Sequence, residues 1–74
     1  MLLKAIINIT AEYAECDPGE ITVETAFADL GLSETDVIDI IMELEDIYMR
    51  GIETEKDPET VGELLSAAKA SLEE

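Results

Sequence analysis

Apolar residues recur every three or four positions in three separate segments of this chain, and this spacing is the strongest constraint on its fold. Such spacing gathers side chains on one face of an α-helix, whereas a half-buried strand needs strict alternation of apolar and polar residues. The segments span residues 2 to 15, about 34 to 49, and 60 to about 72. Because no stretch alternates, the sequence predicts three main helices and no strand.

Residues that stop or cap helices lie at the ends of these segments. In "CDPGE", residues 16–20, Pro18 disfavours helical conformation in the residue before it, which should end the first helix. Gly51 fits the position after the second helix, where a left-handed backbone costs little only for glycine. The pattern "TVGE" predicts a capping box, with Thr60 as N-cap and Glu63 reaching back to the Thr60 amide.

The two longer connections should differ in structure. Residues 20 to 32 form a long loop with several apolar side chains, of which Phe27 and Leu30 should point inward. Residues 52 to 59 are polar and should hold either a short helix or a turn. The chain has 74 residues, so we expect a single domain over residues 1–74. The predicted fold class is all-α: a small antiparallel bundle of three main helices, with room for a short fourth.

The charge balance restricts the classes of partner. Nineteen Asp and Glu face four Lys and Arg, with no His, which gives a formal net charge of -15. Such a chain repels the phosphates of nucleic acids and anionic membranes. It favours proteins with basic patches, although an acidic surface also simply keeps a protein in solution. Because 47% of the residues are hydrophobic and their spacing is periodic, we expect a folded chain that salt stabilises, and the charge favours a monomer.

The residue types exclude most catalytic arrangements. Without His there is no Ser-His or Cys-His pair and no imidazole metal ligand. The four glycines lie too far apart for a phosphate-binding loop, and the carboxylates do not match a calcium loop. Cys16 is the only cysteine, so no intramolecular disulfide can form. We therefore expect a non-enzymatic module without a metal site.

The start of the chain has no signal-peptide pattern. It lacks a basic n-region, an uninterrupted apolar core and a small-residue cleavage site. No apolar run approaches the length of a membrane-spanning helix. A cytoplasmic location without membrane insertion is the resulting expectation.

Ser33 stands at the start of the second predicted helix and has two alternative roles. In "SETD", residues 33–36, it fits an N-cap with Asp36 at the third helical position. A capping hydroxyl accepts a backbone N–H bond, and its loss costs about 1 kcal/mol. Alternatively, the hydroxyl is a point of chemical attachment.

Four fragments in order resemble one known family. They are "CDPGEITVETAF" (16–27), "DLG" (29–31), "VIDIIMELEDIY" (37–48) and "TVGELL" (60–65). Their sequence and order are similar to those of acyl carrier proteins, the small acidic helical modules of fatty-acid and polyketide assembly. The likeness covers nearly the whole chain. Each fragment alone is a weak signal, but four in the right order make a specific match.

The resemblance implies a site at the start of the second helix. The family carries acyl groups on a phosphopantetheine arm, attached to the serine of an Asp-Ser-Leu motif. Aligning "DLG" and "IIMELED" without gaps places Ser33, Glu34 and Thr35 over that motif. The attachment position then falls on Glu34, which cannot accept the arm. Ser33 is the candidate attachment residue, but it lies one residue early, a rotation of roughly 100° on a helix. The capping role is therefore favoured.

The resemblance also implies a docking surface on the second helix. Asp39, Glu45 and Asp46 match positions where the family presents carboxylates to basic patches on its enzymes. Ile38 and Met42 match apolar positions that supplement those charges, and a flexible methionine suits an adaptable interface. The implied partners are acyl-metabolism enzymes with basic patches, including a phosphopantetheinyl transferase.

Two functional hypotheses follow from the resemblance. In the first, the chain is an acyl carrier protein with 4'-phosphopantetheine on Ser33. In the second, it is a carrier-like interaction protein without the arm or any acyl cargo. The segment between Tyr48 and Thr60 is shorter than the family's usual connection, which reduces the expected shelter for an acyl chain. An acidic adapter unrelated to acyl metabolism is a third alternative.

Overall fold

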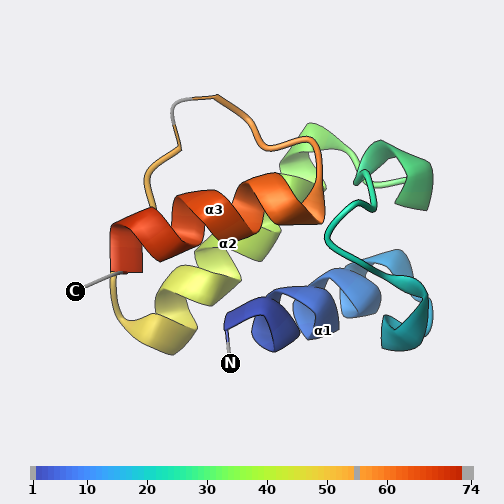
Figure 1. The fold of residues 1–74 in the computed structure, drawn as a ribbon, viewed down its shortest axis with the longest axis horizontal. Helices are drawn as coiled ribbons and strands as arrows, with labels where there is room; N and C mark the ends of the chain where they lie inside the picture. Colours follow the sequence, from blue (N-terminus) through green and yellow to red (C-terminus); the bar gives the residue numbers. More distant parts are fainter. Residues whose placement is uncertain (1, 55, 73–74) are drawn as a thin grey trace.

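The computed structural model describes residues 2–54 and 56–72, and its regular structure is helical (Figure 1). The elements are α1 (Leu2–Ala14), η1 (Pro18–Glu20), η2 (Ala28–Leu30), α2 (Glu34–Tyr48) and α3 (Val61–Leu72), where η marks a single 3-10 turn. An isolated antiparallel bridge joins Ala26 to Thr60, and the described residues contain no strand. The predicted all-α fold with three main helices is confirmed.

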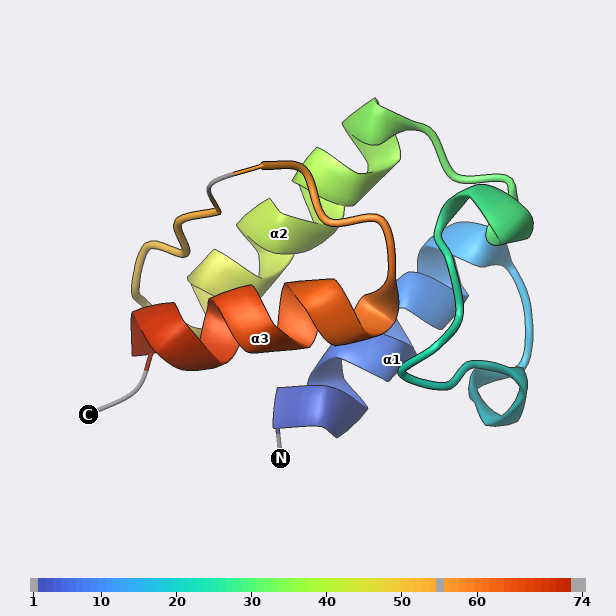
Figure 2. The ribbon, with the colours of Figure 1, turned by 45° about the horizontal axis from the view of Figure 1, so that its top comes forward.

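The three helices pack around one aliphatic core. α1 contacts both α2 and α3 and runs in the opposite direction to them, as Figures 1 and 2 show. The connection from residue 49 to 60 returns the chain to the end of the molecule where α2 begins. None of the helices in the described ranges has the length and apolar content that a membrane crossing requires.

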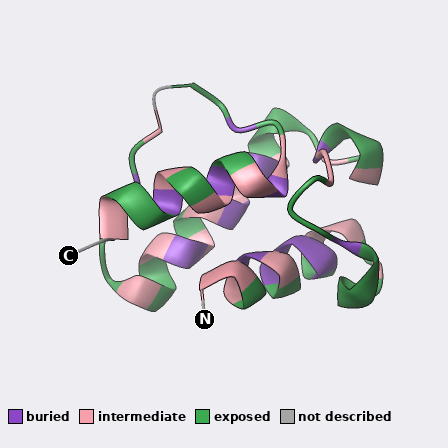
Figure 3. Ribbon diagram, viewed as in Figure 1, coloured by how far each residue is buried: buried purple, intermediate pink, exposed green. Residues whose placement is uncertain are grey.

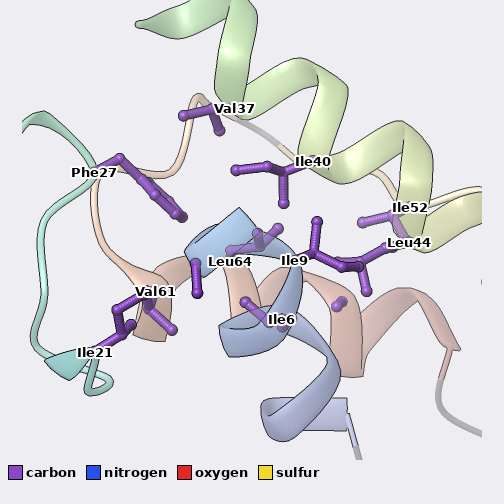
Figure 4. Close-up of a cluster of buried hydrophobic side chains, with 12 residues drawn as sticks. Ile6, Ile9, Ile21, Phe27, Val37, Ile40, Leu44, Ile52, Val61 and Leu64 are labelled. Atoms are coloured by element: carbon purple, nitrogen blue, oxygen red, sulfur yellow. The ribbon is translucent and has the colours of Figure 1, made fainter. Parts of the chain in front are cut away.

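Each of α1, α2 and α3 contributes fully buried aliphatic side chains to the core (Figures 3 and 4). The buried members are Ile6, Ile9, Ala11, Ile21, Phe27, Val37, Ile40, Leu44, Ile52, Val61, Leu64 and Ala68. Phe27 is buried as predicted, and Leu30 is half-buried against the same core. The long loop therefore packs inward, and it holds the start of α2 close to the core.

The ends of α1 and α2 differ from the predictions in the residue that takes the left-handed conformation. α2 ends at Tyr48, and the left-handed residue after it is Met49 (φ 57°) rather than Gly51. Because Ile52 is buried and its N–H donates to the Glu45 carboxylate (2.8 Å), the chain must turn before Gly51. α1 likewise ends in a left-handed residue, Glu15 (φ 59°), ahead of the predicted stop at Pro18.

The connection before α3 has no helix in its described residues. Residues 52–54 and 56–59 contain no helix, so of the two predicted alternatives the short fourth helix is not found there. Hydrogen bonds hold both ends of this connection to α3: Glu53 N–H donates to Ser71 Oγ (2.9 Å), and Glu59 N–H donates to Glu63 Oε1 (2.7 Å).

The capping box of α3 is shifted from its predicted form. The Glu63 N–H donates to Thr60 Oγ1 (3.1 Å), as predicted, but the Glu63 carboxylate accepts from the Glu59 amide and not from Thr60. The neighbouring bridge supplies the reason, because Phe27 N–H to Glu59 O and Val61 N–H to Thr25 O fix this segment against the loop. In this position the Glu59 N–H donates to the Glu63 carboxylate.

Candidate functional site

Ser33 occupies the N-cap of α2 and takes part in a complete capping box. Its backbone is extended (φ -88°, ψ 173°), and its Oγ accepts from the Asp36 N–H at 3.2 Å. In return, Asp36 Oδ2 accepts from the Ser33 N–H at 3.0 Å. The predicted capping role is confirmed. The Ser33 side chain is exposed, but its oxygen is turned back toward the helix.

Glu34 is the first residue inside α2. Its side chain is exposed, and with Asp36 it places two carboxylates in the first helical turn. Negative charge there interacts favourably with the helix dipole. Glu34 therefore stabilises the start of α2, and it presents a carboxylate where the alignment would place an attachment serine.

A cavity of about 320 Å³ lies beside this helix start. Its lining combines the loop, the first half of α2 and the connection before α3: Ala26, Phe27, Ala28, Leu32, Ser33, Glu34, Val37, Ile38, Ile41, Asp57, Pro58 and Glu59. Its size is at the lower end of the range for small-molecule sites, and most of the lining side chains are apolar. The cavity could hold a small apolar group next to Ser33.

One side of α2 faces away from the core and combines apolar and acidic residues. We call this surface, made of Ile38, Asp39, Met42 and Asp46, the outer face of α2. Ile38 is 49% exposed and Met42 is 55% exposed. Asp46 is exposed and Asp39 is half-buried. The structure thus brings together four of the five predicted partner-binding residues.

Glu45, the fifth of those residues, has a different environment. It is half-buried, and its Oε2 accepts the Ile52 N–H at 2.8 Å. This bond joins the end of α2 to the connection that follows. The carboxylate of Glu45 is therefore engaged within the fold, whereas that of its neighbour Asp46 is exposed.

Two features near α2 escaped the sequence analysis. Met49 is 85% exposed in its left-handed position after the helix. Burial, then the charge and hydrogen bond of Glu43, then the charges of Asp39 and Asp36 raise the pKa of Tyr13 in α1 above its ordinary value. The spacing of these three acidic residues gives a signal for the second feature, because they recur at helical intervals.

The described residues contain no grouping of three or more His, Cys, Asp or Glu side chains that could hold a metal ion. Cys16 is a free, half-buried thiol. The site is thus a capped helix start with a small cavity, followed by a partly apolar, acidic helix face. This arrangement suits recognition by another protein.

Sequence comparison identifies the family to which this arrangement belongs. No protein-family model matches the chain. The chain is 45% identical to the acyl carrier protein of Streptococcus pyogenes serotype M1 over 65 residues, 88% of each chain. It is 34% identical to that of Streptococcus pneumoniae serotype 4 over 65 residues, again 88% of each. It is 36% identical to that of Clostridium acetobutylicum over an alignment of 78 positions that spans all of both chains.

The chain is a small helical carrier-type module, and it belongs to the acyl carrier protein family. The predicted resemblance is confirmed. Because these relatives are carrier proteins and not enzymes, the expected non-enzymatic character is confirmed as well.

Proposed function

We propose that this chain acts in acyl metabolism as a docking module that presents the outer face of α2 to enzymes with basic surfaces. The observation that carries this proposal is the exposure of Ile38 and Met42 next to the carboxylates of Asp39 and Asp46. Apolar contact supplies affinity, while charge complementarity supplies orientation and a fast association rate. A net charge of -15 would steer a basic partner toward the chain from a distance.

A charge reversal on the outer face of α2 tests the proposal. The probe is a purified phosphopantetheinyl transferase, and calorimetry measures its affinity for the chain at low and high salt. Asp46→Lys should weaken binding about tenfold at low salt and less at high salt, because salt screens exposed charges. Glu12→Lys is the matched control, since it reverses an exposed charge on α1. Equal affinities for Asp46→Lys and the wild type would reject the docking surface.

A cargo-carrying role on Ser33 is the second candidate, and two observations favour it. The Ser33 side chain is exposed, and it lines the cavity of about 320 Å³, where an apolar group could shelter. In this role Ser33 Oγ would form a phosphodiester with 4'-phosphopantetheine from coenzyme A, and the nucleotide half of coenzyme A would leave.

The surroundings of Ser33 fit the arm only in part. Its Oγ is held back by the Asp36 N–H, and Glu34 occupies the position that the family alignment assigns to the attachment serine. An acceptor hydroxyl must meet its transfer enzyme in a narrow range of geometries. These facts favour a docking module without cargo over a loaded carrier.

Intact mass distinguishes the two roles. The chain is incubated with coenzyme A and a broad-specificity phosphopantetheinyl transferase, beside a carrier protein known to be converted. The cargo-free role predicts an unchanged mass, and Glu34→Ser should gain the arm because it restores the matched serine. A mass increase in the wild type that Ser33→Ala abolishes would instead establish Ser33 as the attachment residue.

A further inference from the structure

Met49 is an exposed apolar side chain for which the fold shows no use. Of the large hydrophobic residues that are exposed in the described ranges, it is the most exposed, at 85%. It does not join the core cluster, and only its backbone N–H contributes to the end of α2, through a bond to the Glu45 carbonyl. Any non-proline residue could donate that bond.

The backbone at Met49 makes the choice of methionine more unusual. Its φ of 57° and ψ of 36° lie in the left-handed region, which non-glycine residues seldom adopt and where Gly and Asn are preferred at helix ends. α1 also ends in a left-handed non-glycine residue, Glu15, but that side chain is charged and suits an exposed position. Contacts among the described residues therefore do not account for an exposed methionine in this backbone conformation.

Met49 directly follows α2, on the side of the helix that carries Ile38 and Met42. Because Tyr48 before it is helical, the Cα atom of Met49 falls within about 20° of those of Ile38 and Met42 around the helix axis, at about 100° per residue. The three Cα atoms therefore lie on one side of the helix, over about 16 Å along its axis. The acidic run ends at Asp46, and Arg50 follows Met49 directly. A basic partner that reached this end of α2 would gain affinity from apolar contact and not from attraction between opposite charges.

We propose that Met49 is an apolar anchor of the docking surface, buried by the same basic partner enzyme that contacts the outer face of α2. This inference rests on the proposed function. Charge argues for this occupant over a second copy of the chain, because two chains of net charge -15 repel one another. The partner should thus carry Lys and Arg along α2 and an apolar pocket opposite Met49.

Calorimetry with the same purified phosphopantetheinyl transferase tests the anchor. Met49→Gly should weaken binding about tenfold, since burial of a large apolar side chain is lost. Met49→Leu, which keeps the apolar volume, should bind within about twofold of the wild type. Ile47→Ala is the matched control: Ile47 is 54% exposed, but it lies about 160° around the helix from Met49. It should also bind within about twofold.

Two further measurements separate an anchor from a structural role. The loss in Met49→Gly should persist at high salt, whereas the loss in Asp46→Lys should shrink. Met49→Gly should melt at the same or a higher temperature than the wild type, because glycine relieves the left-handed strain. Weaker binding by a protein of equal or greater stability cannot arise from unfolding.

The failures of the two proposals are distinguishable. If Asp46→Lys binds weakly while Met49→Gly binds like the wild type, the anchor is overturned and the docking function stands. If Asp46→Lys binds like the wild type, or the wild type itself does not bind, the docking function fails and the anchor with it.

Discussion

The two sides of α2 carry similar apolar residues but differ completely in exposure. Ile40 and Leu44 are 0% exposed, whereas Ile38 and Met42 are 49% and 55% exposed. The inner pair fills the core between α1 and α3, as Figure 4 shows for Ile40 and Leu44. The outer pair contributes little to the fold. The comparison shows that the apolar residues of α2 exceed what the core uses, and the docking proposal rests on this excess among carboxylates.

The largest effect on stability should come from truncating a buried side chain on the inner side of α2. Leu44→Ala should destabilise the protein by about 2–5 kcal/mol, through lost burial and the cavity left behind. Met42→Ala, two positions from Leu44 and on the opposite side of the helix, should change stability by no more than about 0.5 kcal/mol. Chemical denaturation of both variants measures the contrast.

The variants Leu44→Ala and Met42→Ala should show the opposite order of effects on binding to a partner. At a temperature where Leu44→Ala remains folded, it should bind the transferase like the wild type, while Met42→Ala should bind more weakly. If Met42→Ala instead destabilises the protein as much as Leu44→Ala does, the distinction between the two sides of α2 is wrong.

Glu45 and Asp46 sharpen the comparison because they are adjacent acidic residues with different roles. Glu45→Ala removes the acceptor of the Ile52 N–H and should cost about 1–2 kcal/mol of stability. Asp46→Ala should leave stability unchanged or slightly raised, since it removes one exposed negative charge from an acidic chain. Denaturation midpoints provide the measurement. Equal losses in the two variants would show that the Glu45 bond contributes nothing.

The helix start provides a smaller effect. Ser33→Ala should cost about 1 kcal/mol, because it removes the acceptor of the Asp36 N–H. Ser33→Asp should retain most of that stability, since aspartate also caps helices well but cannot accept an arm. Thermal unfolding of the two variants checks the capping role without reference to any cofactor. A Ser33→Ala variant as stable as the wild type would contradict it.

The sequence predicted the three helices and most of the core because their apolar spacing is local and strong. It also predicted the Ser33–Asp36 cap, which depends on residues three positions apart. It missed the left-handed Met49 and the shifted bond of Glu63, since both depend on contacts distant in sequence. Burial of Ile52 fixes the first, and the bridge between Ala26 and Thr60 fixes the second.

The outer face of α2 was predicted less completely, because its membership also depends on contacts distant in sequence. Periodicity places Glu45 close to the outer residues, but only the folded connection brings the Ile52 amide within 2.8 Å of its carboxylate. No pattern within α2 itself contains that information. The residues of a docking surface can thus be proposed from a family alignment, while the structure separates those that are free to contact a partner from those engaged in the fold.

The smallest effect concerns the border between the two sides of α2, where half-buried Glu43 lies near Tyr13 of α1. Partial burial and the charge of Glu43 raise the pKa of Tyr13, so the fold favours the neutral phenol. This preference stabilises the fold fully at pH values below the pKa that Tyr13 has in the unfolded chain. The stabilisation is lost as pH rises through the higher pKa that Tyr13 has in the folded chain. Glu43→Gln should therefore lower the pKa of Tyr13.

Phenolate absorbance measures that change during a pH titration in a Tyr48→Phe background, where only one phenol titrates. Glu24→Gln removes a negative charge that does not act on Tyr13, so its titration should match that of the background. A Glu43→Gln titration that also matches the background would mean that Glu43 does not face Tyr13. The border of α2 would then belong to the solvent-facing side, and Glu43 would join the acidic residues available to a partner.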